Sequence, residues 1–196
     1  MIVTADEVNR SFRGAVDLLN SRVEGLKSFD MSERGFWRSF TALWLTLPAY
    51  IVSLAVERLR LGLLQPDRSL LGNLWIDLVV ALGHVAAFLA LPVAMIWIAR
   101  WLRREGAYVP FVIVTNWISV IGMLVLSVPA LLMLLGWASP GLASLFSLAF
   151  AVIVIRLQWF ATKSTMGLAT LPSLGIAMLG FGLDAFVETA MRGLLG

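Results

Sequence analysis

An asparagine, an aspartate and a histidine share one apolar stretch and could act together. They are Asn73, Asp77 and His84, spaced by four and seven residues. At 100° per residue they fall within about 40° of one another on a helix. An ionisable side chain at membrane depth is costly and marks a candidate functional site. An aspartate two turns from a histidine can pass a proton or hold a cation, so the set indicates transport chemistry.

The same side chains also fit a structural role. Asp77 lies near the end of its stretch, where water or a basic residue can neutralise it. The basic candidates are Arg58, Arg60 and Arg68. His84 can be a neutral histidine that hydrogen-bonds neighbouring helices together. Because helix packing is the commoner use of such groups, transport is the alternative reading of this set.

The motifs of common enzymes are missing from the chain. It has no cysteine and one histidine, so thiolate chemistry and paired-histidine metal sites are excluded. It also lacks a Gly-x-Ser-x-Gly elbow and a phosphate-binding glycine loop. Asp184 and Glu188 share a helix face, but two carboxylates at that spacing are a poor metal signal. We expect a non-enzymatic protein with no catalytic residue, cofactor or metal site.

Composition indicates a membrane protein. Of the 196 residues, 60% are hydrophobic and 14% charged, with a mean hydropathy of +0.89. Soluble domains carry about 25% charged residues. About 20 helical residues cross a bilayer, and the spans must be helices because lipid cannot pair backbone groups. An all-α bundle of five spans is predicted, at about 36–56, 71–99, 110–136, 140–161 and 168–186.

Four prolines fall inside these predicted spans. They are Pro48, Pro92, Pro129 and Pro172. Proline removes a backbone donor and kinks a helix. Kinked spans suit either a cavity or a compact irregular bundle, and the sequence does not choose between the two.

Residues 1–34 predict an amphipathic segment that precedes the transmembrane domain of residues 35–196. Thr4 and Glu7 fit a capping box, and apolar residues recur at helical spacing over about six turns. The apolar stripe consists of Val8, Phe12, Val16, Leu19, Val23 and Leu26. The segment either binds the membrane surface or a partner, or packs on the protein's own cytoplasmic face.

The basic residues predict the orientation. Eleven lie before the first span, after the second or at the end of the fourth, against four on the other side. By the positive-inside rule the N-terminus is cytoplasmic and the C-terminus outside. Basic residues at span ends suit a membrane protein better than a nucleic-acid binder, so we expect no nucleic-acid partner. The expected location is the bacterial inner (plasma) membrane.

The amphipathic segment, the five spans and the outside C-terminus together resemble the bacterial branch of the Yip1-like membrane proteins. Eukaryotic members carry an Asp-Leu-Tyr-Gly-Pro element before the first span, where this chain has Gly35-Phe36-Trp37-Arg38. A vesicle-trafficking role is therefore not implied. The resemblance implies a non-enzymatic integral membrane protein that acts through partners.

Two functional hypotheses follow from the sequence. The first is a scaffold or accessory subunit that organises partner proteins or lipids, with the lipid bilayer, other membrane proteins or a second copy as partners. The alternative is a small transporter or an ion or proton channel that uses Asn73, Asp77 and His84. The alternative requires these side chains to face a polar cavity shared with Asn116 or Tyr50.

Overall fold

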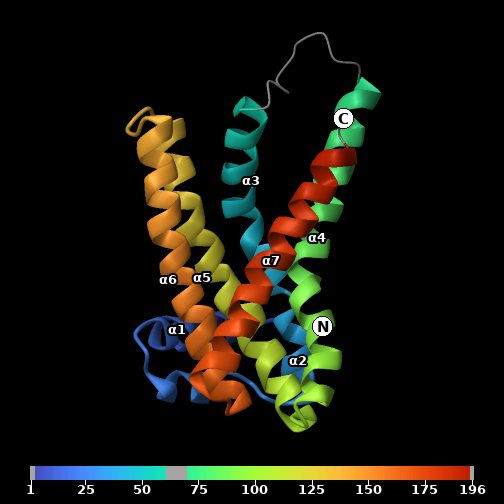
Figure 1. Ribbon diagram of the computed structural model, residues 1–196, viewed down its shortest axis with the longest axis vertical. Helices are drawn as coiled ribbons and strands as arrows, with labels where there is room; N and C mark the ends of the chain where they lie inside the picture. Colours follow the sequence, from blue (N-terminus) through green and yellow to red (C-terminus); the bar gives the residue numbers. More distant parts are fainter. Residues whose placement is uncertain (1–2, 61–69, 195–196) are drawn as a thin grey trace.

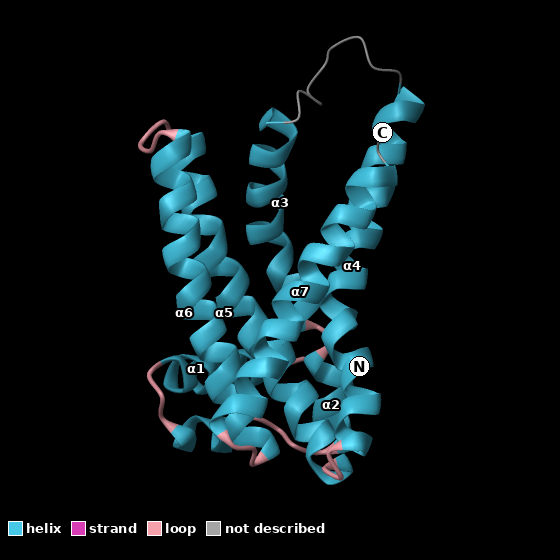
Figure 2. Cartoon of the chain, viewed as in Figure 1, coloured by secondary structure: helices cyan, strands magenta, loops and turns pink. Residues whose placement is uncertain are grey.

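The computed structural model describes residues 3–60 and 70–194, apart from the side chains of Glu57, Arg60 and residues 70–73. Within those ranges every regular element is helical (Figure 2). The elements are α1 (Ala5–Leu19), the 3-10 segment η1 (Val23–Ser28), α2 (Glu33–Ser39), α3 (Ala42–Arg60), α4 (Leu70–Trp101), the 3-10 segment η2 (Glu105–Ala107), α5 (Tyr108–Leu134), α6 (Pro140–Met166) and α7 (Thr170–Leu194).

The predicted all-helical class is confirmed over the described residues. In that part of the chain, five helical segments are long and apolar enough to cross a membrane, which is compatible with a multi-pass membrane protein. We call them the candidate spans: Glu33–Val56, Leu74–Trp101, Glu105–Leu134, Pro140–Met166 and Thr170–Leu194.

The candidate spans run between two ends of the molecule (Figure 1). The basic end contains α1, α2 and the connections from α4 to α5 and from α6 to α7. The open end contains the turn from α5 to α6 and the end of α7. Helix α5 packs on α3 and α6, and α4 packs on α7. At the open end the α5–α6 pair lies apart from the α4–α7 pair (Figure 1).

The hydrophobic core lies at the basic end, around the start of α5. Residues Phe111, Val112, Ile113 and Val114 have no exposed surface. They belong to two neighbouring clusters, one completed by α1 and α6 and the other by α4, α6 and α7. Because partners cover every side of the helix here, even consecutive residues are buried.

The first helix is shorter than the six turns predicted from the sequence. Helix α1 ends at Leu19, and Ser21 adopts a left-handed φ of 59° that reverses the chain into η1. The reversal brings Gly14 against Gly25: a Cβ on Gly14 would lie 2.7 Å from the Gly25 carbonyl oxygen. The stripe is therefore divided between two segments, with Val23 and Leu26 on η1.

Two of the predicted spans also differ in detail. Span one contains a break at Phe40 and Thr41 between α2 and α3. Span five extends to Leu194 rather than residue 186, because Glu188 and Arg192 pair along one face and let the helix continue. Helix α7 begins at Thr170, so Pro172 lies in its first turn, where no intrahelical donor is lost. Pro48, Pro92 and Pro129 lie in the interiors of their helices.

Candidate functional site: a cavity among the candidate spans

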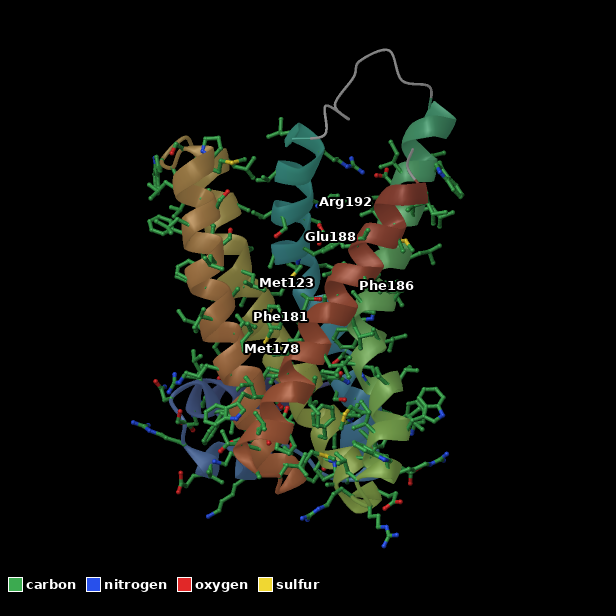
Figure 3. The ribbon with its side chains drawn as sticks, viewed as in Figure 1. Met123, Met178, Phe181, Phe186, Glu188 and Arg192 are labelled. Carbon is green, nitrogen blue, oxygen red and sulfur yellow. The ribbon has the colours of Figure 1, made fainter. Side chains whose placement is uncertain are left out.

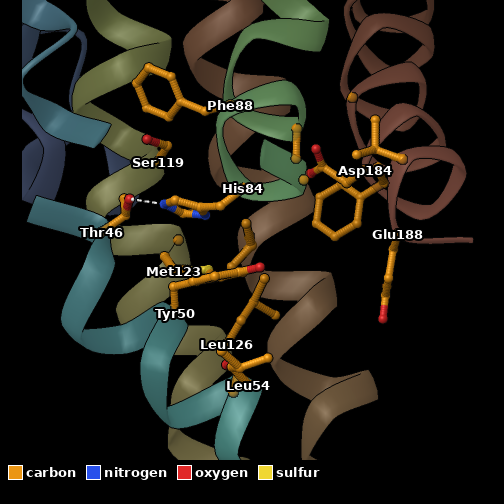
Figure 4. Close-up of a pocket in the computed structure, with 18 of the residues that line it drawn as sticks. Thr46, Tyr50, Leu54, His84, Phe88, Ser119, Met123, Leu126, Asp184 and Glu188 are labelled. Carbon is orange, nitrogen blue, oxygen red and sulfur yellow. Dashed lines mark hydrogen bonds between the residues drawn. The ribbon is translucent and has the colours of Figure 1, made fainter. Parts of the chain in front are cut away.

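A cavity of about 570 Å³ lies among the five candidate spans, each of which contributes side chains to its wall. Its size falls in the range of small-molecule sites, about 300–1,000 Å³. The wall is largely apolar, with Phe88, Met123 and Leu126 among its residues (Figure 4). Of the four prolines that the sequence placed inside spans, Pro92 lines this cavity.

The deeper part of the cavity contains a histidine held by its neighbours. The Nε2 atom of His84 lies 3.0 Å from Oγ1 of Thr46 (Figure 4). That hydroxyl already donates to the Leu43 carbonyl at 2.7 Å, so it accepts from His84, which places the imidazole proton on Nε2. Tyr50 stacks on the His84 ring at 4.0 Å between centroids and donates to the Val80 carbonyl. These contacts join α3 to α4.

A second layer of polar contacts lies toward the basic end. Asn116, 1% exposed, donates from Nδ2 to Oγ of Ser39 at 2.9 Å. Gln158 donates to Oγ1 of Thr115 at 3.4 Å. Asn116, Gln158 and Thr115 line the cavity, and their contacts link α5 to α2 and α6. These polar side chains of the cavity wall thus form hydrogen bonds within the protein, as buried polar groups require.

Two ion pairs lie nearer the open end. Arg58 on α3 pairs with Asp77 on α4. Glu188 and Arg192 pair along α7 at 2.6 Å, and Figure 3 labels both beyond Phe181 on that helix. Arg58, Glu188 and Arg192 line the cavity, whereas Asp77 does not. Arg58 and Arg192 are therefore both engaged by carboxylates at this level.

Asp184 differs from these charged residues. It lines the cavity from α7 (Figure 4), and none of the described side chains forms an ion pair or hydrogen bond with it. It is the fifteenth of the 25 residues of α7 and so lies close to the middle of that helix. Asp184 is solvent-exposed in the structure, and α7 continues for ten residues beyond it.

The structure separates the three residues that the sequence grouped on one helix face. His84 lines the cavity together with Tyr50 and Asn116, as the transport alternative requires. Asp77 turns instead to Arg58, and its side chain is 58% exposed. The side chain of Asn73 lies outside the described residues. Of the predicted set, only His84 can be assigned to the cavity.

The predicted N-terminal stripe is only partly covered. Val8, Val16, Leu19 and Leu26 pack against the core, but Phe12 is 42% and Val23 51% exposed. The most buried face of α1 consists instead of the small or polar residues Glu7, Ser11, Gly14 and Ala15, together with Leu18. Small residues allow α1 to lie close to α5 and α6.

Polar contacts fix α1 to the rest of the protein. The Thr4 hydroxyl accepts from the Glu7 amide as predicted. The Glu7 carboxylate does not complete the capping box, because it accepts from Arg38 of α2 at 2.8 Å. Arg156 of α6 donates to the Leu19 carbonyl and to the Ser21 hydroxyl. These contacts hold both ends of α1 against the candidate spans.

Sequence reasoning considered Asp184 only together with Glu188, as a poor metal signal, and did not assign it to a cavity. The available signal was the apolar run on both sides of it, from Leu171 to Phe186. The predicted span ended at residue 186 because the charged residues Glu188 and Arg192 follow closely. The structure shows that these two residues form an ion pair along the helix.

Comparison with known proteins found no matching family profile, no matching curated protein and no matching solved structure. The interpretation of the cavity therefore rests on its own geometry.

Proposed function

We propose that this protein is a small-molecule carrier of the membrane and that the cavity is its binding site. The observation that carries the proposal is a cavity of about 570 Å³ to which all five candidate spans contribute. A site built from every span changes shape when any pair of helices moves, which is what a carrier needs in order to expose its site to either side.

Weak contacts between the helix pairs support a movement of this kind. Helix α3 touches α4 sparsely, and two polar contacts, Thr46 with His84 and Tyr50 with Val80, join them beside the cavity. By contrast, α5 packs along α6 and α3. Because α7 packs on α6 as well as on α4, the proposed motion separates α4 from α3 at the Thr46–His84 and Tyr50–Val80 contacts.

The proposal includes an orientation. Eleven basic residues at the basic end favour a cytoplasmic location for that end in a bacterial inner membrane. The cavity's mouth would then face outward, together with the C-terminus. Reporter fusions after Gly106 and at the C-terminus test this, with an inside reporter active at Gly106 and an outside reporter active at the C-terminus. A cytoplasmic C-terminus would contradict it.

Thiol labelling tests the carrier proposal directly, because the chain has no native cysteine. Ser119 lines the cavity, and Ser119→Cys provides a single thiol there. A carrier exposes this thiol to a membrane-impermeant reagent in both right-side-out and inside-out vesicles. Ser144→Cys, on an exposed part of α6, is the one-sided control. Labelling of Ser119→Cys from one side alone would contradict alternating access.

A scaffold or accessory-subunit function is a second proposal, supported by the exposed side of the N-terminal segment. Phe12 and Val23 leave apolar surface uncovered beside Arg13 and Arg22. Such a cytoplasmic amphipathic surface suits anionic lipid or a partner chain, at about 1 kcal/mol for each basic residue near the membrane.

The scaffold proposal predicts that Phe12→Asp loosens the N-terminal segment from the membrane or its partner. Limited proteolysis in membranes should then cut the segment faster than in the unaltered protein, and purification in mild detergent should recover fewer companion proteins. Unchanged protection together with unchanged recovery would remove the support for this role.

A further inference from the structure

We propose that the cavity takes an organic monovalent cation and that Asp184 is its counter-charge. This proposal rests on the cavity being the binding site of the proposed carrier, and it adds the chemical class of the ligand. The observation behind it is one carboxylate without a partner among the described residues, within a largely apolar cavity.

The position of Asp184 makes a counter-charge necessary. It lies near the middle of α7, with Gly180 and Phe181 one turn before it on the cavity wall. An ionised carboxylate at that depth is costly unless a positive group meets it. Glu188, one turn further on, is paired with Arg192, so that pair offers Asp184 no positive group of its own.

The basic residues of the wall do not provide that positive group. Arg58 is engaged by Asp77, and Arg192 by Glu188. Arg58 is paired with Asp77, which lies outside the cavity wall, so Asp184 is the one described carboxylate of the wall without an ion-pair partner among the described side chains. An anionic ligand would meet that charge, whereas a monovalent cation would neutralise it.

The wall around Asp184 favours an organic cation over a metal ion. Within the described residues, no group of three or more histidine or acidic side chains could hold a metal, and hard cations need about six oxygen ligands. Phe88 and Tyr50 supply aromatic surface instead (Figure 4), and Phe181 also lines the cavity. Aromatic faces attract organic cations, and apolar walls bury the body of such a molecule.

The cation should therefore bind with its charged nitrogen or phosphorus centre beside Asp184. Its apolar substituents would lie against Phe88 and Phe181, and Tyr50 and His84 would contact it from the deeper side. The volume of about 570 Å³ accommodates a molecule with several rings. The ligand class is an amphipathic cation of drug-like size.

Three probes of similar shape and different charge test the proposal on the purified full-length protein in detergent. They are tetraphenylphosphonium, the anion tetraphenylborate and neutral triphenylphosphine oxide, each measured by equilibrium dialysis. We expect saturable binding of tetraphenylphosphonium that weakens at least about tenfold in Asp184→Asn. Partition into micelles is the same for both proteins and cancels in the comparison.

Two further variants separate the cation proposal from the carrier proposal. Ser119→Phe fills the cavity, and Ser144→Phe places the same side chain on exposed α6. We expect Ser119→Phe to abolish phosphonium binding and Ser144→Phe to keep it, which also shows that a large added ring is tolerated elsewhere in the chain.

Each other outcome overturns the proposal in a recognisable way. If the neutral or anionic probe binds as well as the cation, is lost in Ser119→Phe and is unaffected by Asp184→Asn, the cavity is a binding site but not a cation site. If no probe shows saturable binding, or Ser119→Phe leaves binding unchanged, both the cation proposal and the assignment of the cavity as the site fail.

Discussion

Ile113 and Leu131 lie on the same helix, yet Ile113 is fully buried and Leu131 is 43% exposed. At the basic end, α5 is surrounded by α1, α2, α3, α4 and α6. At the open end, one face of α5 lines the cavity and another carries Leu124, Val128 and Leu131, which no other helix covers. A single apolar helix thus serves as a core at one end and as a cavity wall at the other.

The difference follows from what surrounds the helix rather than from its sequence. Both halves of α5 are largely apolar, and small residues on neighbouring helices decide how closely those helices approach. At the basic end Ala15 of α1 and Ala161 of α6 are buried in the same cluster as Ile113 and allow both helices to approach α5. At the open end the α4–α7 pair lies apart (Figure 1). The packed end fixes the helices, and the open end leaves space for a ligand.

The largest expected effect is on the free energy of unfolding, and it compares the two ends of α5. Ile113→Ala removes buried side-chain volume at the packed end and should lower the free energy of unfolding by about 2–5 kcal/mol. Leu131→Ala at the open end should change it by about 0.5 kcal/mol or less. Unfolding in graded mixtures of mild and denaturing detergent measures both. Equal costs for the two variants would contradict the division into a packed and an open end.

The ion pair between Glu7 and Arg38 gives the next effect. The Glu7 side chain is 7% exposed and the Arg38 side chain 20%. Glu7→Gln therefore leaves a largely buried guanidinium without its charged partner. We expect a loss of about 1.5–3 kcal/mol in the same unfolding assay. The matched control is Asp17→Asn, which breaks a more exposed pair with Arg22 and should cost about 1 kcal/mol at most.

A comparable or smaller cost is expected where α1 meets η1. Gly14→Ala places a Cβ 2.7 Å from the Gly25 carbonyl oxygen and 2.8 Å from Ser28. The backbone must shift, at about 1–3 kcal/mol. Gly175→Ala on α7 meets no atom within 4 Å and should stabilise by about 0.5–1 kcal/mol, since alanine favours a helix. Destabilisation of the same size in both would show that α1 and η1 are not closely packed.

The smallest expected effect depends on pH and lies just before α2. Hydrogen bonds from Ser32 lower the pKa of Asp30 below its usual range. Because the folded pKa is the lower one, this stabilisation is present above the ordinary aspartate pKa and is lost as the pH falls through the folded pKa. Proteolysis of the N-terminal segment should therefore quicken on acidification, and less so in Asp30→Asn. An identical pH response in the two proteins would remove Asp30 from this effect.

The sequence predicted the general fold better than the site. Long apolar runs identified the five candidate spans, and the predicted start of the fourth span at residue 140 agrees with α6, whose N-cap is Ser139. The end of α1 was missed because Ser21 in a left-handed conformation has no simple sequence signal.

The site depends on contacts between distant segments, which periodicity does not reveal. Asp77 and His84 share a helix face, but they bind different partners on another helix. Asp77 pairs with Arg58, whereas His84 hydrogen-bonds to Thr46. Asp184 became visible as a site residue only once the pairing of its charged neighbours was known.

A scan of single nitroxide labels along α5 tests the central claim most directly. Collision with a water-soluble nickel chelate reports aqueous access, and collision with oxygen reports lipid. Labels at the cavity positions Ser119, Met123 and Leu126 should meet the chelate, whereas labels at Leu124, Val128 and Leu131 should meet oxygen. Labels at Val112 and Ile113 should meet neither. Low chelate access at all three cavity positions would contradict an open cavity among the candidate spans.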